Sequence, residues 1–175
     1  MRADLVGVTA DVARLGAQYV WHESAEFEIQ VQATRFSDGN DGRRVSLLGA
    51  RKVVDQPRLD LTVRPRIDAV THSRTDTFYF SPRRAWTAAL TLEAQYITSR
   101  RYERFFIQRA EVTLGAYDQH AIGTEPIGTV LYEHNWRRDP DTELGYGIAW
   151  SSNVYDGQRE SSWRGYLNVL RRFGR

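Results

Sequence analysis

Apolar and polar residues alternate along almost the whole chain, which is the pattern of β-strands with one apolar and one polar face. Between Trp86 and Tyr96 the even positions hold only Trp, Ala, Leu and Tyr, while the odd positions hold Thr, Ala, Glu and Gln. Helical periodicity is nowhere sustained, so the sequence predicts an all-β protein. The predicted strands cover residues 11–21, 25–35, 43–53, 58–70, 86–98, 106–117, 128–136, 142–151 and 163–173.

Most of these strands approach the ~9–11 residues that a tilted membrane-spanning strand requires, whereas soluble strands average ~5–6 residues. Pro65 interrupts one pattern, and a β-bulge is predicted there because proline cannot donate to the ladder. The connections also alternate in predicted length. Short ones fall near residues 22–24, 54–57, 99–102 and 138–141, and longer ones at 36–42, 71–84, 118–125 and 153–161.

Bacterial outer-membrane barrels alternate in this way between short periplasmic turns and longer outer loops. The sequence therefore predicts an antiparallel up-and-down transmembrane β-barrel, with about nine strands present and the last one ending at Phe173 on the periplasmic side. Aromatic residues lie near the predicted strand ends on the apolar face, as interfacial belts require. These are Trp21, Trp86, Tyr96, Trp136, Trp150, Trp163 and Phe173. A soluble sandwich or lipid-binding barrel with these rings in its core is the alternative.

Composition alone does not separate these readings, since 41% hydrophobic and 26% charged residues are ordinary for a soluble protein. No run of about 18 apolar residues occurs, so no transmembrane helix is expected. The absence of cysteine excludes disulfides and thiolate metal sites. A net charge of +2 is too small to indicate nucleic-acid binding.

No catalytic or metal constellation is recognisable, and no cofactor is expected. The four histidines, His22, His72, His120 and His134, do not have metal-ligand spacing. Glu26 and Glu28 share one strand face, whereas glycoside hydrolysis needs two carboxyls across a cleft. We therefore do not expect an enzyme.

Several motifs resemble, in order, the C-terminal barrel of the poly-β-1,6-N-acetyl-D-glucosamine export porins (PgaA/HmsH type). One group lies at residues 36–40, 100–103, 114–117, 123–124 and 144–147. The candidate loop motifs are Tyr79, Phe80, Pro82, Arg83 and Arg84, followed by Tyr155, Asp156 and Gly157. Ser81 departs from the family pattern, where asparagine is expected.

The resemblance implies a sixteen-stranded barrel in the bacterial outer membrane, preceded by periplasmic tetratricopeptide repeats. Residues 1–175 are accordingly expected to form a single β-barrel domain, a C-terminal piece without those repeats and the first strands. No export signal is recognisable at the N-terminus, which fits that expectation.

The same resemblance implies passive export of partly deacetylated poly-β-1,6-N-acetyl-D-glucosamine. The implied partners are outer-membrane lipid, a periplasmic deacetylase and the barrel-assembly machinery. A deacetylated sugar carries an ammonium group, which carboxylates of the polar face would attract. Candidates are Glu26, Glu28, Asp60, Asp68, Glu93, Glu111, Glu133 and Glu143. Neutralisation of each by a neighbouring arginine is the alternative, and a cellulose-type export barrel or a small structural barrel is the alternative function.

Overall fold

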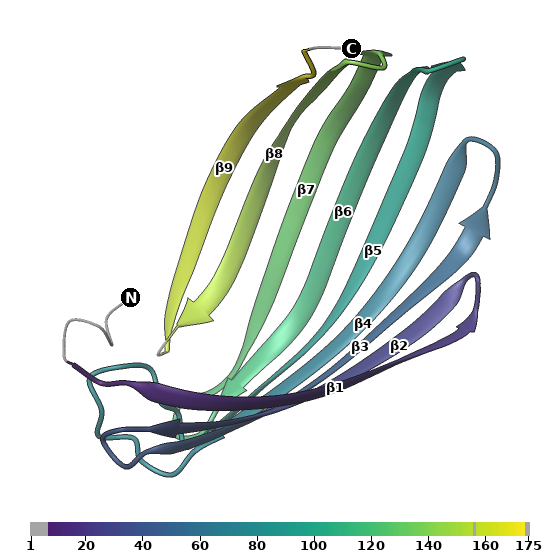
Figure 1. Ribbon diagram of the computed structural model, residues 1–175. Coiled ribbons are helices and arrows are strands. Elements are labelled where there is room, and N and C mark those ends of the chain that lie inside the picture. The colour runs from purple at the N-terminus through teal and green to yellow at the C-terminus, as the bar shows by residue number, and fades with distance from the viewer. Residues whose placement is uncertain (1–6, 156, 174–175) are drawn as a thin grey trace.

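The computed structural model describes residues 7–155 and 157–173, which form one antiparallel sheet of nine strands (Figure 1). The strands are β1 Ala10–His22, β2 Ala25–Phe36, β3 Asp41–Asp55, β4 Leu59–His72, β5 Arg84–Arg101, β6 Arg104–Gln119, β7 Gly123–Asp139, β8 Thr142–Tyr155 and β9 Gln158–Arg171. Their order in the sheet is their order in the sequence. The predicted all-β, up-and-down arrangement is thus confirmed.

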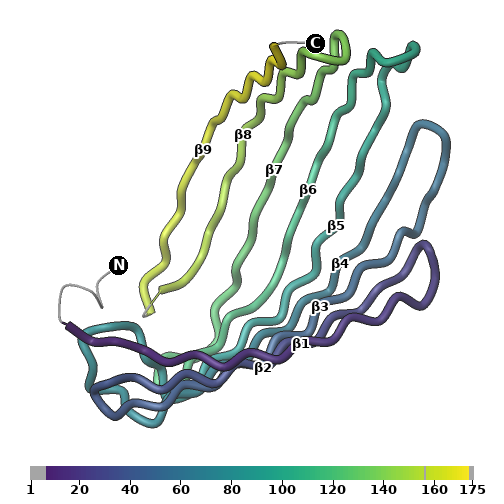
Figure 2. Tube along the Cα trace, in the orientation of Figure 1, coloured from purple at the N-terminus to yellow at the C-terminus, as the bar shows by residue number. Residues whose placement is uncertain are grey.

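The sheet is curved into a trough and is open between its first and last strands (Figures 1 and 2). β1 pairs only with β2, and β9 only with β8, within the described residues. Residues 23–24, 56–58, 102–103 and 140–141 connect strands at one end, here called the turn end. Residues 37–40, 73–83 and 120–122 and the β8–β9 connection lie at the other, the loop end.

The predicted alternation of short turns and long loops is wrong in its lengths. Only residues 73–83 form a long loop in the described part of the chain, because Asp118 pairs with Thr124 and Val154 with Arg159 as strand residues. Polar residues can continue a strand where it leaves the hydrocarbon region, so the apolar alternation fades there while the ladder continues. The predicted direction of each strand is unaffected.

The bulge predicted at Pro65 is also wrong. Pro65 faces Leu90 in an unbroken β4–β5 register. On its other side lies Gly49, where an added Cβ would approach the proline ring to 3.1 Å. Register shifts occur instead just before each of the four connections at the turn end, at Val20/His22, Lys52/Val54, Ile97/Ser99 and Arg137/Asp139. Bulges sharpen strand twist, so the turn end is where this sheet bends locally.

The sheet has no apolar core. Ala85 is the sole hydrophobic residue that is buried within residues 7–155 and 157–173. Large apolar side chains on one face are open instead, with 77% of Leu15, 68% of Leu114 and 67% of Leu167 exposed. A soluble sandwich requires this face to be covered, so the soluble alternative is not supported. The described residues contain no helix long and apolar enough to cross a membrane.

Candidate functional site: the polar face and its mouth

The cross-strand register places all eight candidate carboxylates on one face of the sheet, here called the polar face. Directly paired residues point to the same side. One row therefore runs from Asp60 through Gln95 and Arg109 to Glu133, and its neighbour joins Glu93 to Glu111. Long side chains at the middle of this face are largely covered by their neighbours while those of the other face splay into the open, which indicates that the polar face is the concave one. Two hollows, of about 590 and about 390 Å³, lie on it.

A ladder of ion pairs crosses the middle of the polar face from β4 to β7, and a hydrogen bond extends it to β9. Arg64 binds Glu93 at 2.5 Å, and Arg109 lies 3.4 Å from Glu93 and 2.8 Å from Glu133. The Tyr166 hydroxyl donates to the other oxygen of Glu133. Side chains of Glu93 and Glu133 are only 12% and 15% exposed. The negative charges of these two carboxylates are therefore balanced by Arg64 and Arg109.

Three further candidate carboxylates are also paired with cations. Asp60 lies 3.3 Å from Lys52 Nζ, and Asp68 binds Arg66 and accepts from Ser46 Oγ at 2.7 Å. Arg137 and Arg172 lie 2.7 and 3.6 Å from Glu143. Four of the eight carboxylates therefore have the neighbouring arginine that was the alternative to a free charge, and Asp60 is paired with a lysine instead.

The remaining three, Glu26, Glu28 and Glu111, form no ion pair with any described residue. Glu26 and Glu28 accept only from glutamine side chains of the same face, at 3.1 and 2.5 Å. Glu111 stands directly opposite Glu93 on β5. Arg64 interacts electrostatically with Glu26 and Glu111 without forming an ion pair with either, so all three carboxylates can still be approached by a mobile cation in the trough.

Tyr166 was not predicted as part of this face. Its ring reaches Glu133 across β8 because the intervening residue, Gly147, has no side chain. A Cβ at Gly147 would lie 2.8 Å from the Tyr166 hydroxyl oxygen and 2.7 Å from the Tyr132 carbonyl oxygen. The signal in the sequence was a glycine within a strand, which often marks the close approach of another group.

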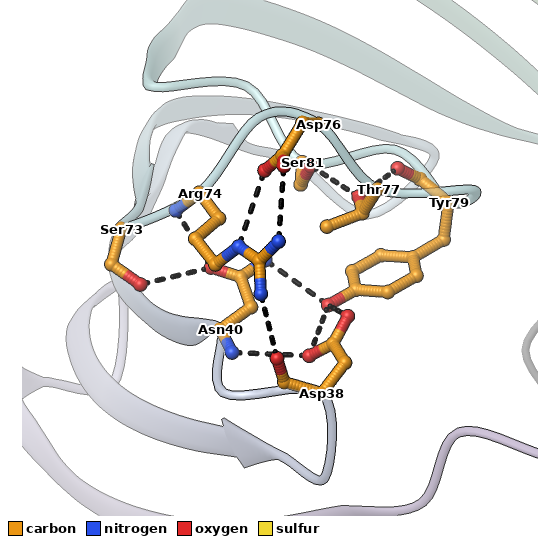
Figure 3. A network of polar contacts seen from close by, with 8 residues as sticks. All are labelled: Asp38, Asn40, Ser73, Arg74, Asp76, Thr77, Tyr79 and Ser81. Carbon is orange, nitrogen blue, oxygen red and sulfur yellow. Dashed lines mark hydrogen bonds and ion pairs between the residues drawn. The ribbon is translucent and has the colours of Figure 1, made fainter.

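At the loop end, residues 73–83 are tied to the β2–β3 turn by a network of polar contacts (Figure 3). Asn40 is fully buried, donates to the Tyr79 hydroxyl, and accepts from Ser73 Oγ and the Arg74 amide at 3.1 and 3.0 Å. The backbone N–H of Asn40 donates to Asp38 Oδ1 at 3.0 Å. This bond closes a tight turn over residues 38–40.

Charge and burial set the protonation states in this network. Burial raises the pKa of Tyr79, so its hydroxyl stays protonated and donates to Asp38 at 3.0 Å. The Arg74 guanidinium, 3.0 Å from Asp76, holds the pKa of that carboxyl below its usual value. The network therefore persists over the neutral pH range.

Replacing Asn40 should free the loop without dismantling the sheet. Asn40→Ala removes three hydrogen bonds and leaves the Arg74 amide unpaired, which costs about 1–3 kcal/mol. We expect faster tryptic cleavage after Arg74 and Arg83. Asn153→Ala, which changes an exposed asparagine near the same end, is the control. Equal cleavage rates in both variants would show that Asn40 does not hold the loop.

Most of the candidate loop residues gather near this network. Tyr79, Phe80, Pro82 and Arg83 lie in the 73–83 loop, Arg84 begins β5, and Tyr155 ends β8. Gly157 lies in the β8–β9 connection with a φ of 77°, and Asp156 lies outside the described residues. The Phe80 ring lies 4.9 Å from that of Tyr155 and so links the loop to β8. Arg84 is therefore a strand residue, while Tyr79, Phe80, Pro82, Arg83 and Tyr155 border the mouth of the trough.

The apolar face carries aromatic side chains near both ends. Trp86, Trp150 and Trp163 belong to strand segments next to the loop end, and Trp21, Tyr96 and Trp136 to segments next to the turn end. His134 also lies at the turn end of this face, between Tyr132 and Tyr146, and the Tyr132 hydroxyl lies 2.9 Å from His134 Nε2. Two bands of amphipathic rings are what a lipid-facing wall presents at the headgroup level.

Comparison with known proteins finds the same architecture elsewhere. The family model "PgaA membrane beta barrel domain" matches residues 1–173. The poly-beta-1,6-N-acetyl-D-glucosamine export proteins of Escherichia coli K12 and O157:H7 are each 26% identical over 160 residues, or 91% of the chain. The chain spans 20% of the length of these relatives.

A solved bacterial polysaccharide outer membrane secretin superposes with a TM-score of 0.85 at 25% identity, covering 99% of this chain and 60% of the other. The predicted family resemblance, transmembrane β-barrel fold and outer-membrane location are confirmed by these matches. The apolar face of the trough is accordingly the face toward lipid. The roles predicted for the carboxylates and loop residues stay predictions.

Proposed function

Because the chain belongs to the PgaA membrane β-barrel family, we propose that its sheet is part of the wall of a pore that exports poly-β-1,6-N-acetyl-D-glucosamine in partly deacetylated form. The observation that carries this proposal is the trio of unpaired carboxylates, Glu26, Glu28 and Glu111, on the concave polar face. The E. coli relatives are named for export of this polymer.

The physical argument concerns the ammonium group that each deacetylated unit carries. A carboxylate and an ammonium 4 Å apart attract by about 1 kcal/mol in bulk water and about 4 kcal/mol near a protein surface. Export requires attraction strong enough for entry and weak enough for release, repeated along the path. Three carboxylates without an ion pair, on strands β2 and β6 of the same wall, meet that requirement better than one deep pocket would.

The wall must be completed before it can function in lipid. Unpaired backbone groups at an open sheet edge are not tolerated in the hydrocarbon region. We propose that the free edges of β1 and β9 pair with further strands of the same barrel. In the same proposal the barrel-assembly machinery inserts the sheet, and a periplasmic deacetylase generates the amines that the carboxylates attract.

The test removes the three free charges together. In cells lacking the gene, the full-length protein with Glu26→Gln, Glu28→Gln and Glu111→Gln should restore less surface aminosugar polymer than the wild type, with synthesis intact. At about 0.5–1 kcal/mol for each of the three exposed charge contacts, binding of a partly deacetylated β-1,6-linked oligomer should weaken roughly 10- to 150-fold at low salt.

A matched control carries the same charge change elsewhere. Glu23 and Glu103 lie in turns, Asp11 lies on the apolar side of β1 by its register with Arg35, and none of the three forms an ion pair with the described residues. Their replacement by the corresponding amide residues should leave both surface polymer and oligomer binding near the wild-type level. Unaltered surface polymer in cells without the gene would refute the proposed function altogether.

A further inference from the structure

A pocket of about 920 Å³ lies at the mouth of the trough, beneath the 73–83 loop. This mouth pocket is lined by that loop, by Phe36 of β2, by residues 119–121 between β6 and β7, and by Tyr155 of β8. Phe36, Gln119 and Tyr155 all belong to the polar face by register, so the pocket lies over the end of the proposed path. A polymer that leaves the trough at the loop end passes this pocket.

The walls of the mouth pocket are aromatic. Phe36 and Tyr79 stack with ring centroids 4.8 Å apart, and Phe80 and Tyr155 approach to 4.9 Å. Phe78 is 82% exposed and has no ring partner in the part of the chain that the structure describes, and Tyr155 is 53% exposed. The lipid belts do not account for these rings, because they lie on the loop or on the polar face.

The polar groups of the mouth pocket differ from those deeper in the trough. Thr75, Thr77, Arg83 and His120 supply hydrogen-bonding groups, and no carboxylate is among the described lining residues. An ammonium group therefore has no anionic partner among the described residues that line the pocket. A neutral sugar unit suits it better, since the C–H face of a pyranose packs on an aromatic ring while its hydroxyl and amide groups hydrogen-bond to the polar side chains.

The pocket is also held in shape before any ligand arrives. Tyr79 is fixed by Asn40 and Asp38, and Thr77 binds Ser81 Oγ and the Tyr79 carbonyl oxygen at 2.6 and 2.8 Å. His72 Nδ1 lies 3.2 Å from the Pro82 carbonyl oxygen at the base of the loop. Binding to a preformed site costs less ordering entropy than binding to a free loop.

We propose that the mouth pocket binds neutral N-acetylated hexosamine units by stacking on Phe78 and Tyr155, and so complements the free carboxylates that attract deacetylated units. This inference rests on the proposed export function. It assigns the two kinds of sugar unit in a partly deacetylated chain to two different places on the wall. Salt should weaken attraction to the carboxylates and leave stacking at the mouth almost unchanged.

The test measures binding of two probes to the full-length protein in detergent by calorimetry, at low and high salt. The probes are a fully acetylated β-1,6-linked N-acetylglucosamine hexasaccharide and its partly deacetylated counterpart. Two stacking rings contribute on the order of tenfold in affinity. Phe78→Ala with Tyr155→Ala should therefore weaken binding of the neutral probe about tenfold, equally at both salt concentrations.

Matched variants separate stacking from other causes. Tyr102→Asn removes a 94% exposed ring at the turn end, at a φ of 55° that asparagine tolerates, and should bind the neutral probe normally. Phe78→Leu keeps apolar bulk without a ring, and should weaken binding even if the double alanine variant fails to assemble. Heat-modifiable gel mobility verifies assembly in each case.

The inference is overturned if the wild type does not bind the neutral probe, if the ring variants bind it normally, or if Tyr102→Asn weakens it equally. In each of these cases the export function still stands, provided that the deacetylated probe binds in a salt-sensitive way that depends on Glu26, Glu28 and Glu111. If the neutral probe binds as expected but binding of the deacetylated probe depends neither on salt nor on Glu26, Glu28 and Glu111, the proposed role of the carboxylates is contradicted. The proposal for the mouth pocket then still stands.

Discussion

Leu90→Arg is expected to block assembly of the barrel, and Ile148→Arg should do the same. Both side chains lie on the apolar face near the middle of a strand, and are 53% and 51% exposed in the absence of lipid. An arginine at the bilayer midplane on the lipid face costs about 2–4 kcal/mol. Heat-modifiable gel mobility should show mainly the unfolded form for each variant.

Gln95→Arg is the matched control on the opposite face of the strand that carries Leu90. Gln95 lies on the polar face between Asp60 and Arg109, where water and a carboxylate can solvate a new guanidinium. This variant should assemble normally. Equal loss of the folded form in Leu90→Arg and Gln95→Arg would contradict the assignment of the two faces.

Gly147→Ala is expected to destabilise the sheet more than any other glycine-to-alanine change on β8 or β9. The new Cβ would lie 2.7 Å from the Tyr132 carbonyl oxygen, which is backbone and cannot swing away, and 2.8 Å from the Tyr166 hydroxyl oxygen. Overpacking costs about 1–3 kcal/mol, and a lost hydrogen bond to a carboxylate about 1.5–3 kcal/mol. The urea midpoint for loss of the heat-modifiable form should fall accordingly.

Gly165→Ala provides the comparison, because the nearest atom to its added Cβ is 4.0 Å away. Tyr166→Phe isolates the hydroxyl. If Gly147 acts by making room for Tyr166, the effects of Gly147→Ala and Tyr166→Phe should be less than additive. A Gly147→Ala variant as stable as Gly165→Ala would show that the position of the Tyr166 ring does not require a glycine at residue 147.

Alternation in the sequence was sufficient to predict the strands and their faces, because a side-chain period of two is an intrinsic property of extended backbone. It failed at the strand ends, where residues 118–125 and 153–161 lie beyond the apolar band and lose the alternation while keeping the ladder. The proline was misread for a related reason. The β3–β4 ladder skips Pro65 and resumes in the same register on both sides of it, an arrangement between strands that local pattern does not reveal.

The candidate site was predictable as a face but not as a set of free and paired charges. The alternation placed Glu93 and Glu111 together correctly, yet pairing of Glu93 with Arg64 and Arg109 depends on the register between strands. The anchoring role of Asn40 and the mouth pocket depend on how residues 73–83 fold back over other strands. Contacts between distant segments of a loop have no periodic signal in the sequence.

The strictly sequential order of the strands has a consequence for how such channels diverge. Each described strand makes its ladder only with its immediate neighbours in the chain. Duplication or deletion of one hairpin therefore leaves every other ladder as it was, while the calibre of the closed cylinder changes with the number of strands. An architecture of this kind can be retuned to thicker or thinner polymers two strands at a time.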